Sequence, residues 1–83
     1  MNTQLPTTRD VVRDYISEVF FVDSFEDDAS FLEQGIIDST GMLQLVMFLE
    51  TTYSFKIEDH ELVPENLDSL NKVAAFVHRK SHG

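Results

Sequence analysis

The segment STGMLQLVMFLETTY, residues 39–53, constrains the fold more than any other, because its spacing predicts a helix that is apolar on two faces. The first face has the i, i+3, i+4, i+7 and i+11 spacing of an ordinary core stripe and consists of Met42, Leu45, Val46, Leu49 and Tyr53. The second face, roughly a quarter to a third of a turn away, consists of Thr40, Leu43 and Met47. A chain of 83 residues has too little material to cover every side of such a helix.

The second apolar stripe therefore has two interpretations. Exposed apolar patches rimmed by polar groups are typical of interaction sites, and the flexible thioether of Met47 suits such a surface. Alternatively, the long connection at residues 23–37 folds over the stripe and buries it. The residues alone leave both interpretations open.

The rest of the chain also follows helical spacing. A cap at Thr7 or Thr8 predicts a first helix from about residue 7 to about residue 22. Residues 58–63 predict one or two helical turns before Pro64, and Asp68 or Ser69 is expected to cap a last helix. The sequence thus predicts an all-α fold, a small four-helix bundle with three main helices, a short third helix and a long loop between the first two. We expect a single domain over 1–83 with an ordered core of about 6–80.

Two apolar pairs in the long loop are expected to fasten it to the core. Phe31-Leu32 and Ile36-Ile37 stand on either side of Gly35, in a segment that is otherwise polar and acidic. We predict that both pairs are anchors.

Charge distribution indicates which partners the chain can have. Fifteen acidic residues against six Lys and Arg give a net charge of -9. No basic residue lies between Arg13 and Lys56, whereas nine acids do, and they surround the apolar helix along the sequence. Nucleic acid is not expected as a partner, because phosphate binding needs clustered cations. A field of one sign favours docking to a basic protein surface.

The sequence gives little support for disulfides, thiol chemistry, membrane segments or metal sites. The chain has no cysteine, which excludes disulfides, thiolate metal ligands and protein-borne thiol chemistry. The amino-terminal residues lack the pattern of a signal peptide, and no apolar run approaches the length of a bilayer span. We therefore expect a soluble, cytoplasmic protein that does not bind membranes. No metal site is expected, since only His78 and His82 share a helical spacing, and they lie in the tail.

Asp38 and Ser39 precede the apolar helix, where an N-cap belongs. In isolation such a pair is usually only a cap. A hydroxyl at a helix N-terminus, however, also faces the positive end of the macrodipole and unpaired N–H groups, which is a favourable place for a phosphate. We expect Ser39 to cap the helix and to have this second role, with the adjacent acid helping to recruit a metal-dependent transferase.

The sequence FLEQGIIDS at residues 31–39, followed by LVMFLE at residues 45–50, resembles the acyl carrier protein family. The resemblance extends over nearly the whole chain, from the first helix to Val77. It implies a carrier that is not itself an enzyme. In that family the serine of the Asp-Ser pair bears 4′-phosphopantetheine, transferred from coenzyme A, and its thiol holds an acyl, aminoacyl or peptidyl group. By motif match Ser39 is the attachment residue and Asp38 is recognised by the phosphopantetheinyl transferase.

The resemblance also implies a set of partners. These are the transferase, a ligase that loads an acyl or aminoacyl group, and downstream biosynthetic enzymes that dock basic patches against the second helix. The residues expected to contact partners are Thr40, Leu43, Met47 and Glu50. The carrier is expected to be a monomer.

Three positions depart from the carriers of fatty acid synthesis. Thr40, Gly41 and Gln44 replace residues that are usually apolar or acidic there, and Gly41 weakens the helix by about 1 kcal/mol relative to Ala. The pattern is more similar to a stand-alone carrier in a specialised pathway of lipid or secondary metabolite synthesis. The alternative is an unmodified helical interaction module that keeps the carrier fold. The Asp38-Ser39 pair favours the modified carrier.

Overall fold

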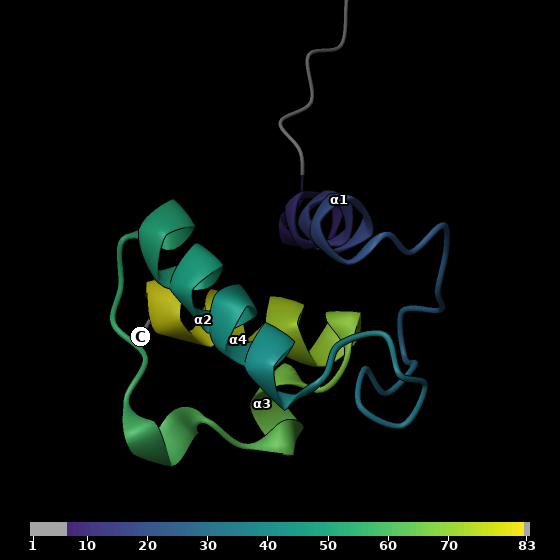
Figure 1. The fold of residues 1–83 in the computed structure, drawn as a ribbon. Helices are drawn as coiled ribbons and strands as arrows, with labels where there is room; N and C mark the ends of the chain where they lie inside the picture. Colours follow the sequence, from purple (N-terminus) through teal and green to yellow (C-terminus); the bar gives the residue numbers. More distant parts are fainter. Residues whose placement is uncertain (1–6, 83) are drawn as a thin grey trace, which may run out of the picture.

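The computed structural model describes residues 7–82, apart from the side chain of His82, so both ends of the expected 1–83 domain lie outside the described residues. Its elements are α1 (Thr8–Phe20), α2 (Ser39–Tyr53), the 3₁₀ helix η1 (Asp59–Glu61), α3 (Pro64–Leu67) and α4 (Leu70–His82). The long connection runs from the end of α1 to the start of α2 (Figure 1). Within residues 7–82 every regular element is helical, which confirms the predicted small bundle.

The first helix begins where its cap predicts. The Thr7 hydroxyl accepts a hydrogen bond from the backbone N–H of Asp10 at 3.1 Å, and the Asp10 carboxylate accepts one from the N–H of Thr7 at 3.3 Å. This reciprocal capping box satisfies two N–H groups that have no partner within the helix. The helix ends at Phe20, two residues before its predicted end, because Phe21 adopts the left-handed conformation with φ 57°.

The segment before the last helix differs from the prediction. Instead of helical turns at 58–63 alone, a 3₁₀ turn at Asp59–Glu61 is followed by the separate helix α3, which starts at Pro64. Proline suits a first helical position, because its φ is already helical and its missing N–H would have no partner there. Ser69 is the cap of α4, since its hydroxyl accepts from the N–H of Lys72 at 3.1 Å.

The core draws side chains from α1, α2, α4 and the long loop. Its fully buried members include Val12, Ile16, Phe31, Ile37, Leu45, Leu49, Leu70 and Val73. Phe31 and Ile37 confirm the predicted anchoring of the loop, and Ile36 packs against the core from its edge. The expectation was wrong for Leu32, which is 44% exposed. The backbone reverses between Phe31 and Ile36, with a hydrogen bond of 2.8 Å from the N–H of Ile36 to the carbonyl of Phe31, so that Phe31, Ile36 and Ile37 pack on the core while Leu32 does not.

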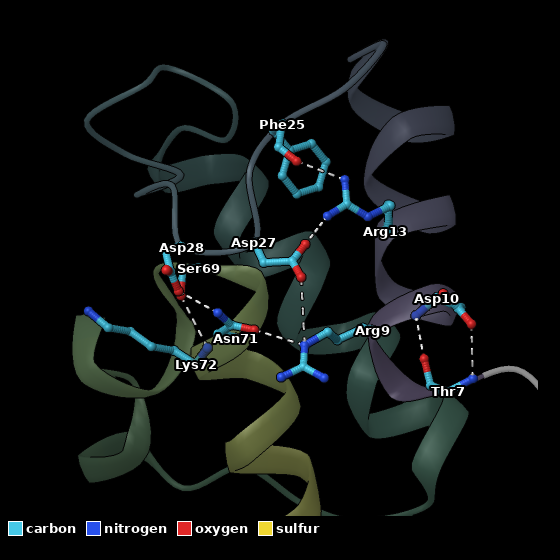
Figure 2. Close-up of polar contacts among 10 residues, drawn as sticks. All are labelled: Thr7, Arg9, Asp10, Arg13, Phe25, Asp27, Asp28, Ser69, Asn71 and Lys72. Atoms are coloured by element: carbon cyan, nitrogen blue, oxygen red, sulfur yellow. Dashed lines mark hydrogen bonds and ion pairs between the residues drawn. The ribbon is translucent and has the colours of Figure 1, made fainter.

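Polar contacts hold the acidic part of the long loop on α1 and α4 (Figure 2). Arg13 donates to the Asp27 carboxylate, and Arg9 Nε donates to Asn71 Oδ1 at 2.8 Å. Asn71 in turn donates its backbone N–H to the carbonyl of Asp27 at 3.0 Å and its amide to Asp28. Asp27 and Asp28 therefore have structural partners, which the expectation that the acids surround the apolar helix did not anticipate.

Candidate functional site

The N-terminus of α2 is capped by Asp38. Its Oδ1 atom accepts from the backbone N–H of Gly41 at 2.7 Å, and its backbone is extended, as at most N-caps. Ser39 follows as the first residue of the helix, and it is exposed. The expectation that Ser39 caps the helix was therefore wrong. Because Asp38 satisfies the N–H of Gly41, the Ser39 side chain is not needed for that bond.

Gly41 allows the end of α1 to approach the first turn of α2. A Cβ atom at this position would lie 2.6 Å from Cε1 of Phe20 and 2.9 Å from Cγ2 of Ile37, both of which are closer than real Cβ contacts. From the sequence, Gly41 was expected only to weaken the helix, and this close approach was not predicted. A glycine inside a helical pattern was the available signal, since such a residue often has a packing reason. The close contact fixes the position of Ser39 relative to the bundle.

Ser39 lines an apolar groove between α2 and the segment around α3. The groove has a volume of about 220 Å³. Met42, Val46 and Leu67 line it, and the exposed leucines Leu32, Leu43 and Leu62 line it as well. Leu32, although exposed, thus forms part of the groove wall. An exposed hydroxyl at this place can bear a linear group, and the neighbouring groove offers that group an apolar surface.

Asp68 is the one charged residue among those that line the groove in the described part of the chain. Its carboxylate accepts from the hydroxyl of Ser30 and, at 3.1 Å, from the backbone N–H of Leu32. Its own carbonyl accepts from the N–H of Phe31 at 2.8 Å. Asp68 therefore ties the loop before α2 to the junction of α3 and α4, and this tie holds Leu32 beside the groove.

Three of the four residues expected to contact partners lie exposed on α2. Thr40 is exposed, and Leu43 and Met47 are 59% and 66% exposed, so the long loop leaves this stripe uncovered. Glu50 differs from the other three. It is half-buried, and its Oε2 atom accepts from the backbone N–H of Ile57 at 2.9 Å. Its carboxylate therefore fastens the connection that follows α2.

A polar clip centred on Glu61 lies next in sequence to Leu62, which lines the groove. The Glu61 carboxylate accepts from the backbone N–H of Glu58 and from the Lys80 ammonium, each at 2.9 Å. These two bonds, the first above all, lower the pKa of Glu61. The clip joins η1 to α4 and so steadies the chain that leads into Leu62.

The site suits a covalently attached phosphate group. The first turn of α2 presents backbone N–H groups and the positive end of the helix dipole, which favour a phosphate on Ser39. The neighbouring groove is apolar enough to contact an attached arm. Among the described side chains, no group of three or more His, Asp or Glu could hold a metal ion. The side chain of His82, half of the tail pair, lies outside the described residues. Within residues 7–82, no helix has the length and apolarity needed to cross a bilayer.

Comparison with known proteins points to the same site. Residues 10–77 match the family model described as phosphopantetheine attachment site. The D-alanyl carrier protein of Lactococcus lactis subsp. cremoris strain MG1363 is 28% identical over 75 residues, which cover 88% of this chain and 95% of that protein. The D-alanyl carrier protein of Lactococcus lactis subsp. lactis strain IL1403 is 30% identical over 74 residues, covering 87% and 94%.

Proposed function

Since the chain belongs to the family that contains a phosphopantetheine attachment site, we propose that Ser39 is the attachment residue and that the arm carries an aminoacyl or acyl group to partner enzymes. The chain is a carrier and not an enzyme, and its cofactor is covalently attached 4′-phosphopantetheine. This group supplies a terminal thiol, on which the cargo is held as a thioester. We propose that the carrier is located in the cytoplasm, as expected from the sequence.

One observation carries the assignment to Ser39. It is the exposed hydroxyl that stands on the first residue of α2, immediately after the Asp38 cap, and that also lines the apolar groove. Attachment forms a bond from Ser39 Oγ to the phosphorus next to the pantetheine half of coenzyme A and breaks the pyrophosphate bond. The adenosine bisphosphate half leaves with the hydroxyl proton, so atoms and charges balance. The dipole of α2 favours the phosphodiester that remains.

The cargo is proposed to be an aminoacyl group. The support is the similarity to D-alanyl carrier proteins over most of both chains. A ligase that activates the amino acid would load it onto the thiol, and a downstream enzyme with a basic docking surface would remove it. A fatty acyl cargo is the alternative, and the apolar lining of the groove favours it.

Intact mass spectrometry tests the attachment. The purified protein is incubated with coenzyme A, magnesium and a broad-specificity phosphopantetheinyl transferase, beside the Ser39→Ala variant. We expect one phosphopantetheine on the wild type and none on the variant. The modified protein is then offered D-alanine or fatty acids with matching ligases, and thioester formation identifies the cargo class.

The alternative function gives a different result. An interaction module with the carrier fold would stay unmodified with several transferases, although its circular dichroism spectrum showed it to be folded. That outcome would overturn the assignment to Ser39. The presence of Asp38 and Ser39 at the start of α2 favours the carrier.

A further inference from the structure

Phe21, the residue that follows α1, neither packs its side chain in the core nor has a favourable backbone conformation. It is 91% exposed, and its backbone is left-handed with φ 57° and ψ 45°. This conformation is unfavourable for a bulky L-residue, whereas Gly or Asn would end the helix at lower cost. The aromatic side chain therefore occupies a position that neither its burial nor its backbone preference explains. Strained backbone of this kind is concentrated at functional positions.

Phe21 lies at the same end of the bundle as Ser39. The ring of its neighbour Phe20 touches the position of Gly41 so closely that a Cβ atom there would lie 2.6 Å away. Gly41 is two residues beyond Ser39 in the first turn of α2. The exposed ring thus follows directly after the contact between the end of α1 and the turn that bears Ser39.

A second apolar groove lies between α1 and α2. Its walls include Val19, which is 40% exposed, and Met47, which is 66% exposed. Tyr15 and Phe48 also line the groove, with their rings stacked 3.9 Å apart. Phe21 does not line this groove but follows Val19 by two residues at the end of α1, and we define Val19, Phe21 and Met47 together as the α1–α2 face. Phe21 is its most exposed member, so it is the side chain best placed to enter a partner.

The charges around the α1–α2 face are negative. Glu18 precedes Val19 and Asp23 follows Phe21 by two residues, and both acids are exposed. No Lys or Arg lies between Arg13 and Lys56, and Arg13 is turned towards the loop, where it donates to Asp27 and to the carbonyl of Phe25. A complementary partner surface has an apolar pocket rimmed by cations. A second copy of this acidic chain is a poor match, since like charges would face each other.

We infer that Phe21 is a docking anchor for the phosphopantetheinyl transferase, and that it enters an apolar pocket with a Lys or Arg rim on that enzyme. The inference rests on the proposed function of Ser39. The transferase must bring its active site to Ser39 Oγ itself, so it must cover the surface around the start of α2. Enzymes that act on the cargo reach only the far end of the arm and can approach from further away. The transferase is therefore the partner for which the position of Phe21 matters most.

Steady-state kinetics of phosphopantetheine transfer test the anchor. The Phe21→Asn variant removes the ring and suits the left-handed backbone, so it keeps or improves the fold. We expect its KM for the carrier to rise about tenfold, as for a central interface residue, with kcat unchanged. The conservative Phe21→Tyr variant keeps the ring and should restore the wild-type KM.

A pair of charge variants tests the rim. Glu18→Gln should raise KM, and the difference from wild type should shrink at high salt. Asp14→Asn changes another exposed acid on α1, seven residues before Phe21, and is the matched control, with KM unchanged. Thermal melts of all variants confirm that they are folded.

The outcomes separate the two proposals. A wild-type KM in Phe21→Asn, with normal modification of Ser39, would overturn the anchor and leave the carrier function standing. A wild type that gains no mass would overturn both. A dimer that dissociates on Phe21→Asn would assign the α1–α2 face to self-association and would also overturn the anchor.

Discussion

Replacing Gly41 with alanine tests the contact that places the start of α2 against α1. The added Cβ atom would lie 2.6 Å from the ring of Phe20, 2.9 Å from Ile37 and 3.2 Å from Oδ1 of Asp38. Ile37 is 1% exposed and has little room to move, whereas Phe20 is half-buried and can yield in part. The Asp38 oxygen is the one that accepts the capping bond, so a shift there also weakens the cap.

Two opposing effects determine the size of the change. Alanine gains about 1 kcal/mol over glycine from helix propensity in a helix interior, and less in the first turn. Overpacking a close contact costs about 1–3 kcal/mol. Because two of the three neighbours are held in place, we expect overpacking to win and the free energy of unfolding to fall by about 1–2 kcal/mol. For a chain of this size, each kcal/mol lowers Tm by about 4–8 °C.

Urea unfolding followed by circular dichroism measures this free energy. Thr40→Ala is the control, because it changes the neighbouring exposed residue and reports helix propensity alone. Phe20→Leu in the Gly41→Ala background should recover part of the loss, since it removes the ring atom at 2.6 Å. A Gly41→Ala protein as stable as wild type, or more stable, would refute the close contact and the reasoning built on it.

Five further substitutions probe the site and its supports. In urea unfolding, Asp38→Ala should lower the free energy of unfolding by about 1 kcal/mol through the lost cap, whereas Asp38→Asn keeps the cap and Ser39→Ala stays within about 0.5 kcal/mol of wild type. Slower phosphopantetheine transfer to Asp38→Asn would show that the transferase recognises the charge of Asp38. A transfer rate equal to that of wild type would speak against this recognition. Tyr53→Phe should be neutral or stabilising by up to about 1 kcal/mol in a thermal melt, since the Tyr53 hydroxyl is buried without a hydrogen-bond partner in the described residues, and a clear loss would contradict that. The Glu58 N–H and Lys80 lower the pKa of Glu61 below its ordinary 4.5, so its contribution to stability is complete above that value and is lost as pH falls through the lowered pKa. Glu61→Gln should therefore flatten the acid side of the stability profile, and an unchanged profile would count against the clip.

Periodicity and caps predicted the features that depend on local sequence. The two faces of α2 follow from its spacing, and the burial of Leu49 agrees with it, whereas the sequence left open whether Met47 is exposed. The cap of α1, predicted at Thr7 or Thr8, also lies within one turn of chain and is Thr7, although the reciprocal bond of Asp10 was not predicted. The position of Ser39 at the start of the second helix was predicted in the same way.

Features that depend on tertiary contacts could not be predicted. Whether Asp38 or Ser39 caps α2 depends on where the first helical residue falls, and packing by Ile37 and Phe20 sets that position. Glu50 has the spacing of an exposed residue, yet its carboxylate binds the N–H of Ile57 in the returning chain. The role of Gly41 likewise required knowledge of which helix lies against it.

The bonds that hold the acidic loop also set an order of folding. Asn71 and Asp28 are 43 positions apart in sequence, and Ser30 and Asp68 are 38 apart. Helices can form from neighbouring residues, whereas these bonds require long stretches of chain to close first, at a cost in entropy. We expect the loop to become ordered after the helices pair, and its amide protons, including that of Leu32, to exchange with solvent before those of α2. We therefore expect the lining that Leu32 and Asp68 contribute to the groove beside Ser39 to open more often than the helical bundle unfolds.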